Sequence, residues 1–267
     1  MRVTCFGSGS SGNTILVQAP DASVLIDAGV PVRRIRQGLA AAGIAIADLS
    51  AVLISHEHWD HVRSLAALAP GLDCPILATE GTAHALAGTA RTWERLEPDA
   101  TLRIGSLAVT PLRVPHDAAE PVGFSIQDGD CAVSVFTDLG EPPPSLAAAI
   151  GHAQLVILEA NYDTAMLARG RYPEHLKRRI RGPLGHLSND DCGALLCVCL
   201  NGAAQDVWLA HLSENNNRPS LATVTVERHL GGPSSTPRIV ALPRHGQDVV
   251  WDSAIARRLP RQVGLPL

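Results

Sequence analysis

The chain has 267 residues, of which 46% are hydrophobic and 18% charged, and its formal net charge is −4 with the histidines neutral. This composition is ordinary for a soluble globular protein, and no apolar run is long enough to cross a membrane. The negative charge excludes a strong overall attraction to nucleic acid, although two bound divalent ions would bring the total near zero.

The length allows one large domain, and no stretch has the charge or the Pro/Gly density of a linker. We therefore expect a single domain over residues 1–259, followed by a disordered tail at residues 260–267. The chain starts directly with a strand and shows no signal-peptide pattern, and its six cysteines fall mostly in apolar runs. These features predict a cytoplasmic protein with reduced thiols.

Apolar runs bounded by turn residues predict strands and helices that alternate along the chain. Strands are expected over residues 2–6, 14–17, 23–27, 51–54, 75–78, 102–114 (a hairpin), 122–127, 131–136, 155–158, 207–210 and 238–242. Helices are expected over residues 32–42, 62–69, 80–87, 190–199 and 221–230, with further helical stretches near residues 169–181. This alternation is typical of a layered α/β fold.

A glycine-serine stretch, residues 7–13, separates the first two expected strands. Its simplest interpretation is a hairpin loop. The functional interpretation is a loop that lines a site, in which amides and hydroxyls, such as those of Ser10, Ser11 and Asn13, hold a phosphate.

Three histidines and an aspartate follow the expected strand at residues 51–54 within six residues: His56, His58, Asp60 and His61. No helix or strand period demands this spacing, so a packing role explains it poorly. A solvated polar loop is the alternative. Imidazoles and carboxylates in one short loop suit Zn²⁺ or a similar transition metal.

Other chemically capable side chains also follow expected strands, where sites of α/β sheets are usually built. They are His116, Asp138, Glu159 and His211. Each would be unremarkable alone, but together they place ligand-type residues at several separate strand ends.

The pattern His56-x-His58-x-Asp60-His61 resembles the signature of the metallo-β-lactamase fold hydrolases. That resemblance implies an α/β fold, a four-layer αββα sandwich, with a pair of metal ions at the top of the two sheets. It also implies that Asp27 braces the histidine loop through hydrogen bonds. The implied ligands are His56, His58 and His116 for one ion, Asp60, His61 and His211 for the other, and Asp138 as a bridge. All the donors are nitrogen or oxygen, so we expect two divalent ions, zinc by default and manganese as the alternative.

A glutamate and a second histidine distinguish tRNase Z and related phosphodiesterases, and Glu159 and His186 stand in similar positions here. The resemblance implies that His186 protonates the leaving alkoxide while Glu159 holds its tautomer, and that the nucleophile is a hydroxide shared by the two ions. Asp60 is expected to act in catalysis as well as to bind a metal ion. The alternative is that Glu159 caps a helix and His186 is a spare ligand or a buried donor.

Several segments resemble one branch of this superfamily, the YycJ-like (WalJ) nucleases: the Gly-Ser-Ser-Gly-Asn stretch and residues 159–163, 185–189 and 211–213. The resemblance implies a 5′-to-3′ exonuclease that acts on DNA ends in a repair setting. The side chains expected to bind substrate phosphates and sugars are Ser10, Ser11, Asn13, Asn161, Ser188, Asn189, Ser213 and Asn215.

Two other functions stay open. One is an acyl hydrolase of the same fold, a lactonase or a thioesterase. The other is a catalytically idle binding module, which the complete ligand set disfavours. A single lysine and a net charge of −4 also argue against strong non-specific binding to DNA.

Overall fold

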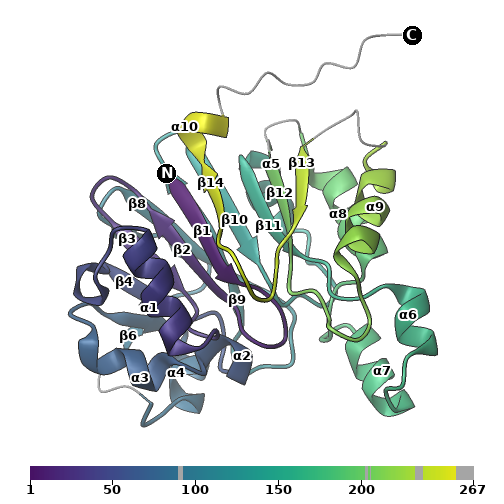
Figure 1. Cartoon of the computed structure of the whole chain (residues 1–267), viewed down its shortest axis with the longest axis horizontal. Helices are drawn as coiled ribbons and strands as arrows, with labels where there is room; N and C mark the ends of the chain where they lie inside the picture. Colours follow the sequence, from purple (N-terminus) through teal and green to yellow (C-terminus); the bar gives the residue numbers. More distant parts are fainter. Residues whose placement is uncertain (90–92, 202–203, 205, 232–236, 257–267) are drawn as a thin grey trace.

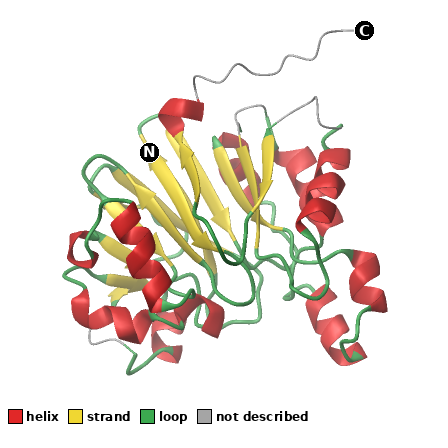
Figure 2. Cartoon of the chain, viewed as in Figure 1, coloured by secondary structure: helices red, strands yellow, loops and turns green. Residues whose placement is uncertain are grey.

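The structure is a computed structural model, and it describes residues 1–256 apart from 90–92, 202–203, 205 and 232–236. Two mixed β-sheets face each other, and helices cover the outer face of each sheet (Figures 1 and 2). This arrangement confirms the αββα sandwich that the sequence predicts. The tail expected at residues 260–267 lies outside the described residues.

The first sheet has the strand order β14-β1-β2-β3-β4-β5-β6. Its strands are β1 (Arg2–Gly7), β2 (Thr14–Gln18), β3 (Ser23–Ile26), β4 (Ala51–Leu53), β5 (Ile76–Ala78), β6 (Glu94–Arg95) and β14 (Val249–Asp252). The pairs from β14 to β3 are antiparallel, and the pairs from β3 to β6 are parallel. The carboxyl ends of β3, β4 and β5 therefore meet at one edge.

The second sheet mirrors the first, with the order β13-β12-β11-β10-β9-β8-β7. Its strands are β7 (Leu102–Ile104), β8 (Leu107–Arg113), β9 (Val122–Asp128), β10 (Cys131–Phe136), β11 (Leu155–Glu159), β12 (Asp206–Ala210) and β13 (Arg238–Ala241). The pairs from β10 to β13 are parallel and the remainder are antiparallel. Strands β10, β11 and β12 thus also end at one edge.

The helices follow the same division (Figure 1). Those of the first half are α1 (Val32–Ala41), η1 (Ile46–Asp48), α2 (Trp59–Val62), α3 (Leu65–Leu68), η2 (Ala69–Gly71) and α4 (Glu80–Ala85). Those that follow are α5 (Leu146–His152), α6 (Thr164–Arg169), α7 (Glu174–Arg181), α8 (Asn189–Cys199), α9 (Pro219–His229) and α10 (Ser253–Ala256). Helices α6 and α7 stand together beyond the end of the second sheet (Figure 1). No helix among the described residues is long and apolar enough to cross a membrane.

Apolar side chains form three buried clusters, one between the sheets and one between each sheet and its helices. The cluster between the sheets joins residues of both, for example Val17, Phe124 and Trp208. Strands β11 and β12 are buried along their whole length, because they are covered on both faces. Coverage on both faces is why these strands appear in the sequence as continuous apolar runs.

Several elements differ from the expectation. The helix expected over residues 62–69 is two short helices, α2 and α3, and α2 begins at Trp59, so Asp60 and His61 lie on α2 rather than in a loop. The amides of His61 and Val62 both donate to the carbonyl of His58, which closes this first turn. Strand β14 was not expected, because its four residues become a strand only by pairing with β1.

We predict that Trp251→Phe lowers the free energy of unfolding by about 1–3 kcal/mol, the cost of leaving a buried acceptor unpaired. Trp251 of β14 is buried, and its Nε1 donates to Oδ2 of the buried Asp206 at 2.8 Å, which links the first sheet to β12 of the second. Urea denaturation measures the change. Val198→Ala, at a position 83% exposed, should stay within about 0.5 kcal/mol. An unchanged midpoint for Trp251→Phe would contradict the prediction.

Candidate metal centre

The candidate site lies where strands of both sheets end. His56, His58, Asp60 and His61 follow β4, His116 follows β8, Asp138 follows β10, Glu159 ends β11 and His211 follows β12. The strands that precede these residues end at one edge of each sheet. Because the two sheets face each other, these two edges lie close together.

A buried carboxylate, Asp27, holds the first histidine loop. Its Oδ1 accepts the amide of Ser55 at 2.8 Å, and its Oδ2 accepts the Ser55 hydroxyl at 2.8 Å and Nδ1–H of His61 at 2.7 Å. Asp27 has φ 58°, in the left-handed region that residues with a side chain rarely adopt. These contacts are the bracing role expected for Asp27.

Glycine is required at one position beside this loop. A Cβ on Gly29 would lie 1.6 Å from the carbonyl oxygen of Asp60. The backbone of α2 can therefore approach β3 closely only because residue 29 has no side chain.

Four histidines use Nδ1 for a hydrogen bond and so keep Nε2 as the ring nitrogen that can bind a metal. The Nδ1 contacts are His56 to Ser55 Oγ at 3.0 Å, His61 to Asp27 at 2.7 Å, His116 to the Gly185 carbonyl at 3.0 Å and His211 to Glu159 at 2.7 Å. Carbonyl and carboxylate oxygens only accept, so Nδ1 carries the proton at the last three positions. Metal-binding histidines are oriented in the same way by such partners.

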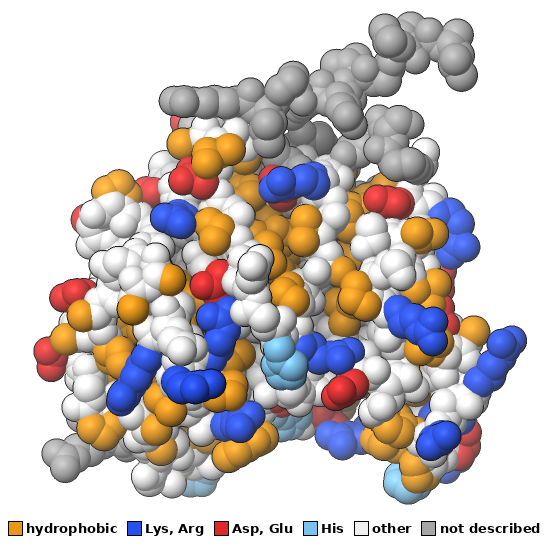
Figure 3. Space-filling model, viewed as in Figure 1, with side chains coloured by type: hydrophobic (Ala, Val, Ile, Leu, Met, Phe, Trp, Pro, Cys, Tyr) orange, Lys and Arg blue, Asp and Glu red, His pale blue; other side chains and the backbone are white. Residues whose placement is uncertain are grey.

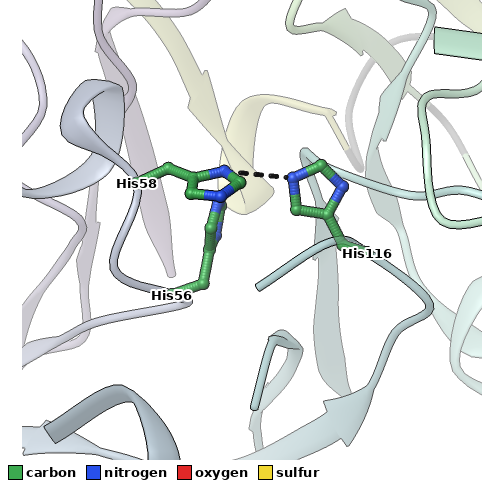
Figure 4. A group of neighbouring side chains, drawn as sticks. All are labelled: His56, His58 and His116. Carbon is green, nitrogen blue, oxygen red and sulfur yellow. Dashed lines mark hydrogen bonds between the residues drawn. The ribbon is translucent and has the colours of Figure 1, made fainter. Parts of the chain in front are cut away.

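Three histidines, His56, His58 and His116, form the first group of potential ligands, with donor atoms within 4.8 Å of one another. Their rings converge from two separate loops (Figure 4). Nδ1 of His58 lies 3.2 Å from Nε2 of His116, so two ring nitrogens face each other. Nε2 of His56 is buried and has no hydrogen-bond partner among the described residues.

Asp60, His61 and His211 form a second group of this kind. Asp60 Oδ2 lies 3.1 Å from Nε2 of His211 and 3.5 Å from Nε2 of His61. Asp138 stands between the groups, because its Oδ2 is 2.9 Å from Nε2 of His61 and its Oδ1 is 3.6 Å from Nε2 of His116. Nε2 of His61 thus faces two carboxylates. Burial lowers the pKa of His61, but the charges of Asp138, Asp27 and Asp60 more than offset this effect and raise it well above its ordinary value. A cation between the two carboxylates would suit both.

These residues fit a divalent metal centre. A buried ring nitrogen lacks a partner, and carboxylates crowd around imidazole nitrogens. The donor set contains only nitrogen and oxygen. Burial and the neighbouring His61 hold the pKa of His56 well below its ordinary value, which keeps its ring neutral and able to bind a metal.

Glu159 and His186 lie together, as the resemblance of their motifs implied. Oε1 of Glu159 is 2.9 Å from Nδ1 of His186, and its Oε2 accepts the amides of Leu139 and Leu187. Burial alone would raise the pKa of the Glu159 carboxyl, but His186 and His211 bring this pKa below its usual range. Burial lowers the pKa of His186, and the charge of Glu159 more than offsets that effect and raises it.

A cavity of about 220 Å³ opens onto these groups. Three of the residues expected to bind substrate line it, namely Ser10, Asn161 and Ser213. Ser11 and Asn215 line a smaller cavity beside it.

The other three residues expected to bind substrate lie away from both cavity walls. The side-chain amide of Asn13 contacts Asp60 Oδ2 and His61 Nε2, so it supports α2. Ser188 caps α8 by accepting the amide of Asp191, and Asn189 is fully buried against Asn217. In this structure these side chains hold loops in place instead of facing a substrate.

Arg179, from the arginine-rich helical stretch at residues 169–181, lines the larger cavity. Sequence reasoning missed Tyr172 and Arg244, which also line the cavities. Each stands outside the conspicuous motifs, and nothing in its neighbourhood in the sequence marks it. Tyr162, which lies beside the Glu159 motif, is buried, so Tyr172 is the tyrosine on the cavity wall.

Comparison with known proteins agrees with this geometry. A family model described as a beta-lactamase superfamily domain matches residues 22–211. The chain is 32% identical over 235 residues to exodeoxyribonuclease YycJ of Bacillus anthracis, covering 86% of this chain and 89% of that protein. It is 31% identical over 236 residues to exodeoxyribonuclease WalJ of Streptococcus pneumoniae, covering 86% and 88%.

Among solved structures, the metallo-beta-lactamase fold protein YhfI from Bacillus subtilis matches with a TM-score of 0.72. The match covers 94% of this chain and 99% of that chain at 20% identity. This likeness supports the fold alone.

We predict that Asp27→Asn weakens divalent-ion binding by roughly 10- to 100-fold, as is usual when a residue that orients a ligand is changed. Asparagine tolerates the left-handed backbone, but its amide would oppose Nδ1–H of His61. Chelator competition with elemental analysis measures the affinity. Asp48→Asn, at an exposed position, is the control. Equal metal retention in the two variants would rule out the bracing role.

Proposed function

Because the chain belongs to the metallo-β-lactamase superfamily of metal-dependent hydrolases and to its YycJ-like branch, we propose that it is a phosphodiesterase, a 5′-to-3′ DNA exonuclease. The observation that carries this proposal is the pairing of the buried Glu159 with His186, which lies on the wall of the cavity that opens onto the metal centre. Exodeoxyribonuclease relatives that align over most of the chain support it.

We propose two divalent ions, zinc by default and manganese as the alternative, held by the two histidine groups with Asp138 as the bridge. Bound divalent ions supply Lewis acidity, which activates water as the nucleophile and stabilises negative charge on the reacting phosphate. The protein's own part is to orient the ligands, which Asp27 and Glu159 do through buried hydrogen bonds.

His186 is the proposed general acid. Its Nδ1 is engaged by Glu159, so Nε2 is the atom left for the leaving oxygen of a substrate. An alkoxide leaving group gains strongly from such a proton, whereas a thiolate leaving group needs less help. The raised pKa of His186 keeps the ring protonated nearer to neutral pH.

Asp60 keeps its proposed double role as ligand and catalytic residue. Burial would raise the pKa of its carboxyl, but His61 and His211 hold it far below its usual range, so the group stays ionised. An ionised carboxylate at the cavity wall can bind a cation and orient a nearby water molecule.

The phosphates and sugars of the substrate are bound by side chains on the cavity walls, namely Ser10, Ser11, Asn161, Ser213 and Asn215. Basic side chains stand in separate groups on the face shown in Figure 3 instead of forming one continuous stripe. We propose a short binding footprint, because a chain with only 3% aromatic residues offers few platforms for base stacking. We also propose one domain over residues 1–259, because both sheets share one hydrophobic cluster, and a cytoplasmic location.

End-labelled DNA ladders test the exonuclease proposal. Single and double strands with either end blocked, together with a circular single strand, should show stepwise shortening from the 5′ end and no cut in the circle. Asp138→Asn should abolish cleavage, and Asp130→Asn in the exposed β9–β10 turn should not. Cleavage of the circle would indicate an endonuclease. Turnover of a thioester or a lactone without cleavage of any oligonucleotide would indicate an acyl hydrolase.

We predict that His186→Ala slows cleavage of DNA by roughly 10²- to 10⁴-fold while metal content stays close to wild type. The loss should be smaller on bis-p-nitrophenyl phosphate, whose leaving group hardly needs a proton. His175→Ala, on the exposed side of α7, should keep both activities. Loss of an ion, or an equal loss on both substrates, would remove the acid role.

A further inference from the structure

A second cavity, of about 110 Å³, adjoins the one at the metal centre. The two share Ser10, Tyr172 and Ser213 in their walls, so a substrate can extend from one into the other. The remaining wall of the second cavity is formed by Ser11, Glu214, Asn215 and Arg244.

Arg244 is held in place at this cavity. A Cβ on Gly9 would come within 2.8 Å of Arg244 Cγ, so the arginine stem lies directly on the glycine-serine loop. Its Nε donates to the Leu212 carbonyl at 3.3 Å, and 24% of the side chain is exposed. Glu214 approaches Nη1 only to 3.9 Å with 71% of its side chain exposed, a pair of little strength that leaves the guanidinium free to bind another anion.

The hydroxyls around Arg244 can all donate. Ser11 Oγ is buried and has no hydrogen-bond partner among the described residues. Ser213 Oγ accepts the amide of Asn216 at 3.2 Å, and Tyr172 Oη accepts the side-chain amide of Asn215 at 3.0 Å. An oxygen that accepts in this way keeps its own proton for another partner.

We infer that this second cavity is an anion subsite that binds a phosphate group of the nucleic-acid strand next to the phosphate that is cleaved. One guanidinium and several hydroxyl donors match phosphate oxygens, which only accept. The volume suits a phosphate and not a whole nucleotide. This inference rests on the proposed nuclease function, and it assigns Arg244 and Tyr172 to substrate binding.

The subsite gives the enzyme a way to recognise a strand end. A terminal phosphate carries more negative charge and more free oxygens than an internal phosphodiester, so Arg244 and the hydroxyls bind it more tightly. A strand anchored in this cavity by its terminal phosphate places its next phosphodiester toward the metal centre, past Tyr172.

The test compares two oligonucleotides of one sequence, with a 5′-phosphate and with a 5′-hydroxyl. The wild-type KM should be roughly 10- to 100-fold lower for the phosphorylated strand, the range for hydrogen bonds to a charged group. Arg244→Gln should remove this difference while kcat changes little. Ser11→Ala, which removes the unpartnered hydroxyl, should reduce the same preference by a smaller factor.

Two controls separate the subsite from general effects. Metal content and the urea midpoint should stay close to wild type in Arg244→Gln and Ser11→Ala, which shows that the metal centre and the fold are intact. Arg103→Gln removes the same charge from an exposed position on β7 and should keep the wild-type preference.

Each outcome has one meaning. Loss of the 5′-phosphate preference in Arg244→Gln identifies a terminal phosphate, and an equal rise of KM for both strands identifies an internal one. An unchanged KM for both strands overturns the subsite while the nuclease function stands. An equal effect of Arg103→Gln overturns it as well. If the wild type cleaves no oligonucleotide, the proposed function fails and the inference fails with it.

Discussion

The carboxylate of Glu159 holds in place the part of the site that the second sheet contributes. It is fully buried at the end of β11, and its two oxygens accept from His186, His211 and the amides of Leu139 and Leu187. A buried carboxylate is costly unless every oxygen is satisfied, so the loops after β10 and β12 must hold their positions to satisfy it. The same contacts that stabilise the charge therefore orient two histidines.

Asp27 holds in place the part of the site that the first sheet contributes, as Glu159 does for the part from the second sheet. Each follows or ends a buried strand that runs parallel to its neighbour, and each engages Nδ1 of a histidine. Asp27 and His211 also have φ values of 58° and 53°, unusual for residues with side chains. Backbone strain of this kind persists only where surrounding contacts compensate for it, and here those contacts come from the metal centre itself.

The sequence allowed the sheet strands and the histidine loop to be predicted for a physical reason. Strands covered on both faces are continuous apolar runs, and a run of histidines directly after one is hard to explain by packing. Arg244 and β14 gave no such signal, because their roles depend on neighbours that are distant in the chain. Ser188 and Asn189 were expected at the substrate, but serine and asparagine serve equally well as caps and as partners in buried networks, and the structure uses them in that way.

Pairing of β14 with β1 has a consequence for how the protein is made. Val249–Asp252 complete a sheet whose first strand is Arg2–Gly7, and the amino group of Met1 donates to Ser253. On the ribosome, one edge of β1 therefore stays unpaired until residues 249–252 have been synthesised. His211, whose amide donates to Ser8, also joins the first half late, so the nascent protein completes its site only after residue 211 has been synthesised.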